Sequence, residues 1–385
     1  MNFDDLDLER LRQRSSEKWS RYPAPTLPAW VAEMDFPVAP AIRAALEQAV
    51  DLDDFGYPTL AGERAVAEAF AERMQQRYGW SAPAARTIVL SDVVQGIYLS
   101  LLALTQPGDG VLIQTPIYPP FLSSVREMGR ALVTSPLVAS GDSHAIDFDA
   151  LRATSSTVRA LLLCHPHNPT GRVFSRHELE QLAQLALARD WIVVSDEIHA
   201  DLTHPGSRFT PFASLAPEVA ERTVTLSSAS KAFNIAGLRC ALAHFGGREL
   251  QRRVESMLPR HVRGGIGILA QHATVAAWRD GDAWLDDVRS TLDANRHWLL
   301  AQLRQRLPDV RVALPQATYL AWLDFRALQL DPSPAEFFRR HAHVALSDGI
   351  AFGEGFEGYA RLNFATSRPL LTEIIERMAR AVANR

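Results

Sequence analysis

The sequence predicts an α/β fold with a large domain, built on a mostly parallel mixed sheet flanked by helices, and a smaller α+β domain. From Ile88 onward, short β-rich runs alternate with longer helical stretches, a pattern typical of strands joined by crossover helices. The β-rich runs are apolar on both faces, as burial between two helical layers requires. A chain of 385 residues, 47% of them hydrophobic, is long enough to build two such domains.

The strand and helix candidates follow one another along the middle of the chain. A helix is expected after Ser175, because Ser175 and Glu178 have the spacing of a capping box ahead of the apolar stretch 179–188. Late in the chain the pattern changes to a long helical stretch, two further strands near 318–325 and 361–365, and a terminal helix. The strand candidates before that change are 88–90, 111–113, 160–164, 192–195, 223–226 and 241–245.

These patterns divide the chain into three parts. Residues 1–40 are rich in proline and poor in periodicity, so they are expected to pack with the small domain rather than to form a core of their own. Residues 41–285 form the predicted large domain, and residues 286–385 form the predicted small domain.

The bulk composition excludes several classes of protein. The formal net charge is −4 and no dense basic run occurs, so neither nucleic acid nor a membrane surface is an expected partner. Only two cysteines are present, too few for a disulfide framework. The first residues lack the apolar core of a signal peptide, and no apolar run approaches the roughly 18 residues of a membrane span. A cytoplasmic protein that acts on a small molecule is therefore predicted.

The segment 228–239 combines a lysine with small hydroxyl residues and an arginine, directly after an apolar run. Lys231 is expected at the C-terminal edge of the sheet, where open α/β folds bind ligands. The hydroxyls of Ser228 and Ser230 are able to donate to a phosphate, and the guanidinium of Arg239 is able to hold it by two parallel bonds. The alternative is a surface loop with an ordinary lysine, and this segment alone leaves both interpretations open.

Asp196 ends the apolar run 192–195 and begins a short polar segment that finishes at His199. A carboxylate in this place is able to pair with a protonated pyridine nitrogen and so keep an aromatic ring electron-withdrawing. Partial burial strengthens such a charge pair. The alternative is that Asp196 caps a helix and that His199 is a polar residue satisfied within the fold.

Asn168 lies in the segment 164–171, between Pro166 and Pro169. Because proline stiffens the backbone, the amide side chain of Asn168 is held against a ligand at little further entropic cost. The histidines and the cysteine of this segment form one set only, whereas zinc sites usually combine paired sets. No metal site is therefore predicted.

Two further segments also follow predicted strands. Tyr118 offers a ring that is able to stack on a planar cofactor, with a position in the core as the alternative. The segment 91–96 joins a strand to a helix and presents the backbone amides of residues 93–95 to a phosphate. By contrast, the glycines of 265–270 lie in a helical context and are interpreted as packing residues rather than as a dinucleotide loop.

The order of these residues is tyrosine, Asn-Pro, aspartate, Ser-x-x-Lys and arginine, each at a strand end. This order resembles the fold-type I pyridoxal-5′-phosphate (PLP) enzymes over nearly the whole chain. Within that superfamily, the chain resembles the MalY/PatB family of cystathionine β-lyases, which is related to the class I and II aminotransferases. The segments that carry this resemblance are 30–36, 166–169, 196–199 and 230–234, and 317–324 and 352–353 add to it.

The resemblance implies a fold-type I transferase fold whose large domain binds PLP. Lys231 would attach the cofactor as a Schiff base, Asp196 would pair with the pyridine nitrogen, and Tyr118 would stack on the ring, so these three are the catalytic candidates. His199 stands where many aminotransferases carry a tyrosine. The implied cofactor-binding residues are Lys231, Asp196, Asn168, Tyr118, His199, Val93, Val94, Gln95, Ser228, Ser230, Arg239 and Tyr57.

The resemblance also implies how the substrate and a second subunit are bound. Arg361 matches the arginine that grips the substrate carboxylate by a bidentate pair. Asn168 and Trp30 are the other candidates for contact with an amino-acid substrate, and Asn168 would also bind the phenolic oxygen of the cofactor. Tyr57 would reach the phosphate held by the neighbouring subunit, so that the active sites of a homodimer are shared.

The implied activity is that of a PLP-dependent carbon–sulfur β-lyase, which cleaves cysteine thioethers to a thiol, pyruvate and ammonia. Lys231 is the expected base for removal of the α-proton. A class I or II aminotransferase is the alternative, because no single residue type decides between elimination and amino transfer. A PLP-sensing transcription regulator would need a DNA-binding module, for which a pattern that begins by Trp30 leaves no room.

Two positions depart from the pattern of the family. Asp92 stands where relatives commonly have glycine, which bears on the geometry of the phosphate loop. Pro119 follows Tyr118 where relatives often have a second tyrosine, which bears on recognition of the leaving group.

Overall fold

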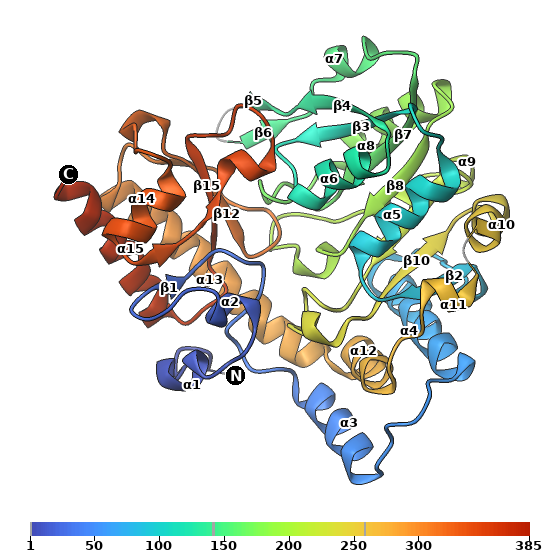
Figure 1. The fold of residues 1–385 in the computed structure, drawn as a ribbon, viewed down its shortest axis with the longest axis horizontal. Coiled ribbons are helices and arrows are strands. Elements are labelled where there is room, and N and C mark those ends of the chain that lie inside the picture. The colour runs from blue at the N-terminus through green and yellow to red at the C-terminus, as the bar shows by residue number, and fades with distance from the viewer. Residues whose placement is uncertain (1, 141–142, 258) are drawn as a thin grey trace.

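The computed structural model describes residues 2–140, 143–257 and 259–385. Its largest sheet has seven strands in the order β2-β10-β9-β8-β7-β3-β4 (Figure 1). The five strands from β9 to β4 are parallel, and β10 is antiparallel to both of its neighbours. This sheet confirms the predicted fold class. The strand bounds are β2 Thr87–Leu90, β3 Gly110–Thr115, β4 Ala131–Pro136, β7 Val158–Cys164, β8 Ile192–Asp196, β9 Thr223–Ser227 and β10 Ala241–Phe245.

The connection between β9 and β10 explains the reversal of β10. It consists of residues 228–240, and its only regular element in the described structure is the 3₁₀ turn Ala236–Leu238. A parallel partner would need a longer crossover, usually a helix. All six strand candidates in this part of the sequence correspond to strands of this sheet, whereas β4 was not predicted. β4 lies at the edge of the sheet and four of its six residues are polar or exposed, so it lacks the apolar run of a central strand.

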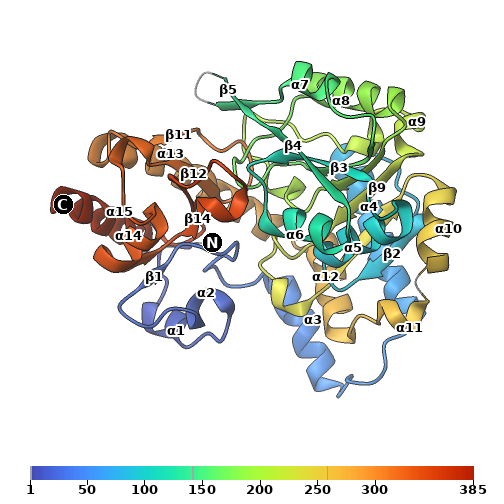
Figure 2. The ribbon, with the colours of Figure 1, turned by 45° about the horizontal axis from the view of Figure 1, so that its top comes forward.

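Helices cover both faces of the large sheet (Figure 2). α5, α6 and α10 pack on one face, where their apolar residues meet those of the strands. α7, α8 and α9 pack on the other face, and α4 and α12 extend this second layer over β2 and β10. The predicted capping box is present at the start of α8. The bounds are α4 Leu60–Tyr78, α5 Val93–Leu104, α6 Pro119–Glu127, α7 Phe148–Arg152, α8 Arg176–Ala188, α9 Pro217–Ala220, α10 Arg248–Met257 and α12 Ile268–Asp280.

A second sheet has four strands in the order β11-β12-β15-β14 and lies with α13, α14 and α15 (Figure 1). The predicted strands near 318–325 and 361–365 are β12 and β15, which pair antiparallel. The proposed division at 285/286 falls in the first turn of α13. The bounds are α13 Asp282–Arg306, β11 Arg311–Val312, β12 Leu320–Asp324, α14 Pro334–His341, β14 Ser347–Asp348, β15 Tyr359–Asn363 and α15 Arg368–Ala383.

The N-terminal residues run beside this second sheet (Figure 2). β1 pairs parallel with β13, which comes shortly after α14. β5 and β6 pair antiparallel in a separate two-stranded sheet. The remaining bounds are α1 Leu8–Arg12, α2 Glu17–Ser20, β1 Leu27–Pro28, α3 Pro40–Asp51, β5 Val138–Ser140, β6 Ser143–Ala145, α11 Arg260–Arg263 and β13 Val344–Ala345.

The topology places several of the predicted cofactor-binding residues near one edge of the large sheet. Because β3, β7, β8 and β9 are parallel, the residues that follow them emerge at the same edge, where open sheets bind ligands. Among the described residues, no helix is both long enough and apolar enough to cross a membrane.

Candidate active site

Lys231 lies just beyond the end of β9, with its side chain directed at the N-terminal part of the chain. Its Nζ donates a hydrogen bond to the main-chain carbonyl of Ala32, at an Nζ–O distance of 3.0 Å. Burial, together with the positive charge of Arg361, lowers the pKa of the Lys231 amine to about 8. A substantial neutral fraction of this amine is therefore present near neutral pH, as a nucleophile or base requires.

Asp196 is the last residue of β8 and is buried. One of its oxygens, Oδ1, accepts a hydrogen bond of 3.0 Å from the amide of Ile198. Burial raises the pKa of Asp196 to about 7, against the opposing effects of that amide and of Lys231. A cationic ring nitrogen beside this carboxylate would stabilise its charged form.

Arg361 and Asn168 are in direct contact, although they come from different sheets. Arg361, on β15, is only 4% exposed, and its Nη1 donates to Oδ1 of Asn168 at 2.9 Å. Its Nη2 donates to the carbonyl of Trp30 at 3.0 Å and to Oγ of Ser347 at 3.2 Å. Nε of Arg361 is buried and has no hydrogen-bond partner within the described residues. Nε is therefore a free donor from which a carboxylate would be able to accept a hydrogen bond.

The segment 30–36, which we call the strap, crosses between these residues. Nδ2 of Asn363 donates to the carbonyls of residues 31 and 33, at 2.7 and 2.6 Å. The side chain of Asn234 accepts from the amide of Met34 and donates to the carbonyls of Met34 and Phe36, at 2.9 to 3.0 Å. Side chains of the site therefore fix the strap in place through its backbone.

Tyr118 and His199 complete the polar side of the site. Tyr118 immediately precedes α6 and is partly buried, and burial raises the pKa of its phenol. His199 is buried and its Nδ1 has no partner among the described residues. Burial lowers the pKa of His199 to about 3, so its imidazole is neutral.

The predicted phosphate ligands lie around the start of α5. Oγ of Ser228 donates to the carbonyl of Cys240 at 2.6 Å and accepts from the amide of Ser230 at 3.0 Å. The carboxylate of Asp92 accepts from the amide of Gln95 at 2.7 Å and forms an ion pair with Arg239. The hydroxyl of Ser228 thus already uses its proton within the protein, while the amides of Val93 and Val94 lie in the first turn of α5.

Tyr57 is not part of this arrangement in a single chain. Its side chain is 96% exposed, and it lies between α3 and α4. The structure therefore leaves Tyr57 outside the group of predicted residues that it brings together.

Two cavities meet at the strap. One, of about 1050 Å³, is lined by Ala32, Lys231 and Arg239 among others. The other, of about 430 Å³, is lined by Trp30, Tyr118, Phe352 and Arg361 among others. Val31 borders both cavities, so the strap lies between the cavity that Lys231 lines and the cavity that Arg361 lines.

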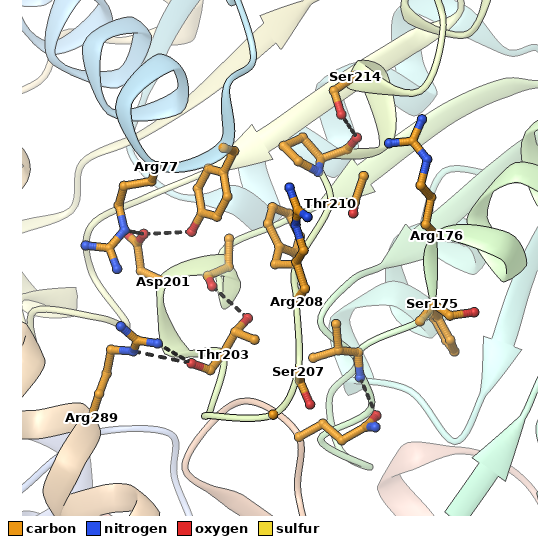
Figure 3. A pocket seen from close by; sticks show the side chains of 18 residues that line it. Arg77, Ser175, Arg176, Asp201, Thr203, Ser207, Arg208, Thr210, Ser214 and Arg289 are labelled. Atoms are coloured by element: carbon orange, nitrogen blue, oxygen red, sulfur yellow. Dashed lines mark hydrogen bonds and ion pairs between the residues drawn. The ribbon is translucent and has the colours of Figure 1, made fainter.

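A separate cavity of about 630 Å³ lies beside the loop 200–210 (Figure 3). Nε of Arg77 pairs with Oδ1 of Asp201 at 3.6 Å, and Nη2 of Arg289 donates to the carbonyl of Thr203 at 2.9 Å. These arginines tie α4 and α13 to the loop. Among the described residues that line this cavity, none is a predicted site residue.

Sequence analysis missed the role of three groups in the site. Tyr319 donates from its hydroxyl to the Ala32 carbonyl at 3.0 Å, the same oxygen that accepts from Lys231. Asn234 and Asn363 hold the strap. The available signal was a polar side chain three residues after Lys231, just before an apolar strand or at the end of one. The partners of these residues lie about 200 to 330 positions away in the chain.

The residues present fit PLP. A PLP molecule carries an aldehyde, a basic ring nitrogen, a phenolic oxygen and a phosphate. The amine of Lys231 suits the aldehyde, and the buried carboxylate of Asp196 suits the basic ring nitrogen. The unpartnered Nδ1 of His199 lies in the same buried site, and Arg239 lies at the amide-rich start of α5.

Comparison with known proteins agrees with this geometry. A family model described as aminotransferase class I and II matches residues 31–378. Cystathionine β-lyase PatB of Bacillus subtilis is 37% identical over 100% of both chains, and protein MalY of Escherichia coli is 30% identical over 93% of this chain and 92% of its own. The PLP-bound C–S lyase structure from Staphylococcus hominis has a TM-score of 0.93 at 30% identity and covers 100% of each chain. The chain therefore belongs to the aminotransferase class I and II family, in the branch that contains PatB and MalY.

Proposed function

We propose that this protein is a PLP-dependent carbon–sulfur β-lyase of the cystathionine β-lyase type, which converts cysteine thioethers and water to a thiol, pyruvate and ammonia. The observation that carries the proposal is that Lys231, Asp196 and Asn168 lie at one edge of the large sheet and that Arg361 of the second sheet contacts Asn168 there. The full-length relative PatB is a cystathionine β-lyase.

Bound PLP would withdraw electrons from the α-carbon of an attached amino acid and so make its proton acidic. The carboxylate of Asp196 would sit against the ring nitrogen and keep it protonated. Asn168 would donate from its Nδ2 to the phenolic oxygen while its Oδ1 stays bonded to Arg361. Tyr118 would stack on the ring and, with the strap, exclude water from it.

Arg361 would hold the substrate carboxylate. Its Nη1 is bonded to Asn168, and its buried Nε is free to form one arm of a bidentate pair. This grip would fix the α-carbon so that its hydrogen faces Nζ of Lys231. Lys231 would then take the α-proton and return a proton to the departing sulfur, as one group with a pKa near 8 is able to do.

The test is to incubate the purified holoenzyme with L-cystathionine and to measure pyruvate, ammonia and free thiol together. Equal amounts of the three products, all lost in Lys231→Ala, are expected. Amino transfer from glutamate to a 2-oxo acid at a higher rate than elimination would instead identify an aminotransferase. Absence of all three products with every thioether amino acid in a panel would exclude the lyase.

We also propose that two copies of this chain share their active sites. Tyr57 is 96% exposed, and Phe55, Leu52 and Leu60 beside it are exposed apolar residues. Covering such a patch with a second copy would remove it from water, and Tyr57 would reach the partner's phosphate site. A mixture of Lys231→Ala and Tyr57→Ala proteins should be more active than either variant at limiting PLP. A monomer by light scattering would exclude this arrangement.

The proposed compartment is the cytoplasm. Cys164 and Cys240 are both free and buried, and such thiols persist in a reducing environment. Fractionation of cells that produce the protein would test this assignment.

A further inference from the structure

Asp92 contacts two of the residues that are predicted to hold the cofactor phosphate, Gln95 and Arg239. It caps the N-terminus of α5, in an extended conformation with φ −161° and ψ 169°. Its Oδ1 accepts from the amide of Gln95 at 2.7 Å, and its Oδ2 is paired with Nη2 of Arg239. One carboxylate therefore engages both a helix-end amide and a guanidinium.

These two donors belong to the set that is expected to hold the cofactor phosphate. A carboxylate and a phosphate both present negative oxygens, so they compete for the same amide and guanidinium hydrogens. The two oxygens of Asp92 thus stand in for two phosphate oxygens. Asp92 and Arg239 are 147 positions apart in the chain, so tertiary folding brings them into contact.

We propose that Asp92 is an internal competitor of the cofactor phosphate: it keeps the phosphate loop ordered without cofactor and weakens the binding of PLP. The bound phosphate would have to displace the carboxylate from Arg239 and the Gln95 amide, or lie beside a like charge. This inference rests on the PLP site of the proposed function but not on the reaction that follows.

The plain alternative is that Asp92 only caps α5. Asparagine and aspartate are equally good N-caps, so Asp92→Asn keeps the cap and removes the charge. Asp92→Gly removes both. The matched control is Asp147→Asn, because Asp147 caps α7 in the same way, through the amides of Asp149 and Ala150, and belongs to none of the site contacts described above.

The dissociation constants of two ligands are measured: PLP, and pyridoxal, which lacks the phosphate. The proteins are the cofactor-free full chain and its variants Asp92→Asn, Asp92→Gly and Asp147→Asn. Equilibrium dialysis with absorbance detection needs no substrate, so its result is independent of whether the protein is a lyase. Loss of one like-charge contact should tighten PLP binding about tenfold in Asp92→Asn. The dissociation constant of pyridoxal should be the same for Asp92→Asn as for the unmodified protein. Asp147→Asn should bind PLP as tightly as the unmodified protein does.

Two results would overturn the inference. Either PLP binds Asp92→Asn no more tightly than the unmodified protein, or PLP and pyridoxal affinities rise by the same factor. Thermal melting of each cofactor-free variant verifies that the comparison is made between folded proteins.

Discussion

The amine of Lys231 donates to the carbonyl of Ala32, a residue 199 positions earlier in the chain, at an Nζ–O distance of 3.0 Å. The hydroxyl of Tyr319 donates to the same oxygen, also at 3.0 Å. Two donors therefore share one acceptor on the strap. Because the hydroxyl of Tyr319 competes for that carbonyl, the carbonyl stabilises the charged form of the Lys231 amine less than it would with the amine as its sole donor.

The first prediction concerns the pH at which Lys231 reacts. Only the neutral amine attacks the aldehyde of PLP, so the rate of recombination of cofactor-free protein with PLP should rise with pH and level off above about 8. Stopped-flow absorbance between pH 6 and 10 measures this profile. A midpoint near 10.5, the ordinary value for lysine, would show that burial does not lower the pKa of Lys231.

Tyr319→Phe should move that profile upward. Without the competing hydroxyl, the Ala32 carbonyl accepts more strongly from the charged amine, and a hydrogen bond to the charged form favours that form. We expect the midpoint to rise by up to about one pH unit. Tyr98→Phe, which removes a surface hydroxyl bonded to Glu127, is the matched control and should leave the profile unchanged.

Asp196→Asn should have opposite effects on stability and on activity. The folded pKa of about 7 lies above the ordinary 3.8, so the stability that Asp196 contributes is present below pH 4 and lost as the pH rises through 7. The cofactor-free variant should therefore resist urea better than the unmodified protein at pH 8, and equally at pH 4. The holoenzyme should lose about 100-fold in activity, since a neutral amide cannot hold the ring nitrogen charged.

The control for this comparison is Asp149→Asn, at a position whose side chain is 95% exposed. Its urea stability should follow that of the unmodified protein at both pH values. Lower urea stability of Asp196→Asn than of the unmodified protein at pH 8 would contradict this prediction. It would mean that the charged carboxylate is stabilised in the folded protein despite its burial.

Arg361→Lys should raise KM for L-cystathionine by about 10- to 100-fold, because an ammonium cannot reproduce the planar bidentate grip on a carboxylate. Binding of an amine without a carboxylate, such as an S-substituted cysteamine, should change little. Arg326→Lys, at an exposed ion pair with Asp324, serves as the control. An equal loss of affinity for both ligands would indicate that Arg361 supports the fold rather than the substrate.

Asn234→Gly should loosen the strap. Asn234 has a positive φ of 57°, which glycine adopts without strain, so the substitution removes three hydrogen bonds and keeps the backbone conformation. The free energy of unfolding should fall by about 3 kcal/mol, near 1 for each bond, as measured by urea denaturation.

Gln329→Gly is the matched control for the strap, because Gln329 also has a positive φ, of 47°, at an exposed turn. Its stability should remain close to that of the unmodified protein. A similar loss in both variants would mean that the glycine itself, and not the strap contacts, causes the effect.

The segments that carry the site residues could be predicted from the sequence because the patterns that mark them span only a few neighbouring residues. Apolar runs predicted the strand that ends at Asp196 and the two strands that are followed within a few residues by Asn168 and Lys231. Parallel strands place their C-terminal ends at one edge of the sheet. The capping box of Ser175 and Glu178 was readable for the same reason, since both partners lie within four residues. The fold class and the family followed from the order of these segments.

By itself, the amino-acid sequence determined which residue types stand at the strand ends and, through their order, the family and the expected cofactor. Only the tertiary structure decided that Ala32 accepts from Lys231 and Tyr319, that Arg361 is bonded to Asn168, and that Asp92 is paired with Arg239. The physical reason is distance along the chain: periodicity and capping report neighbours within a few residues, whereas these contacts form when packing closes loops of more than one hundred.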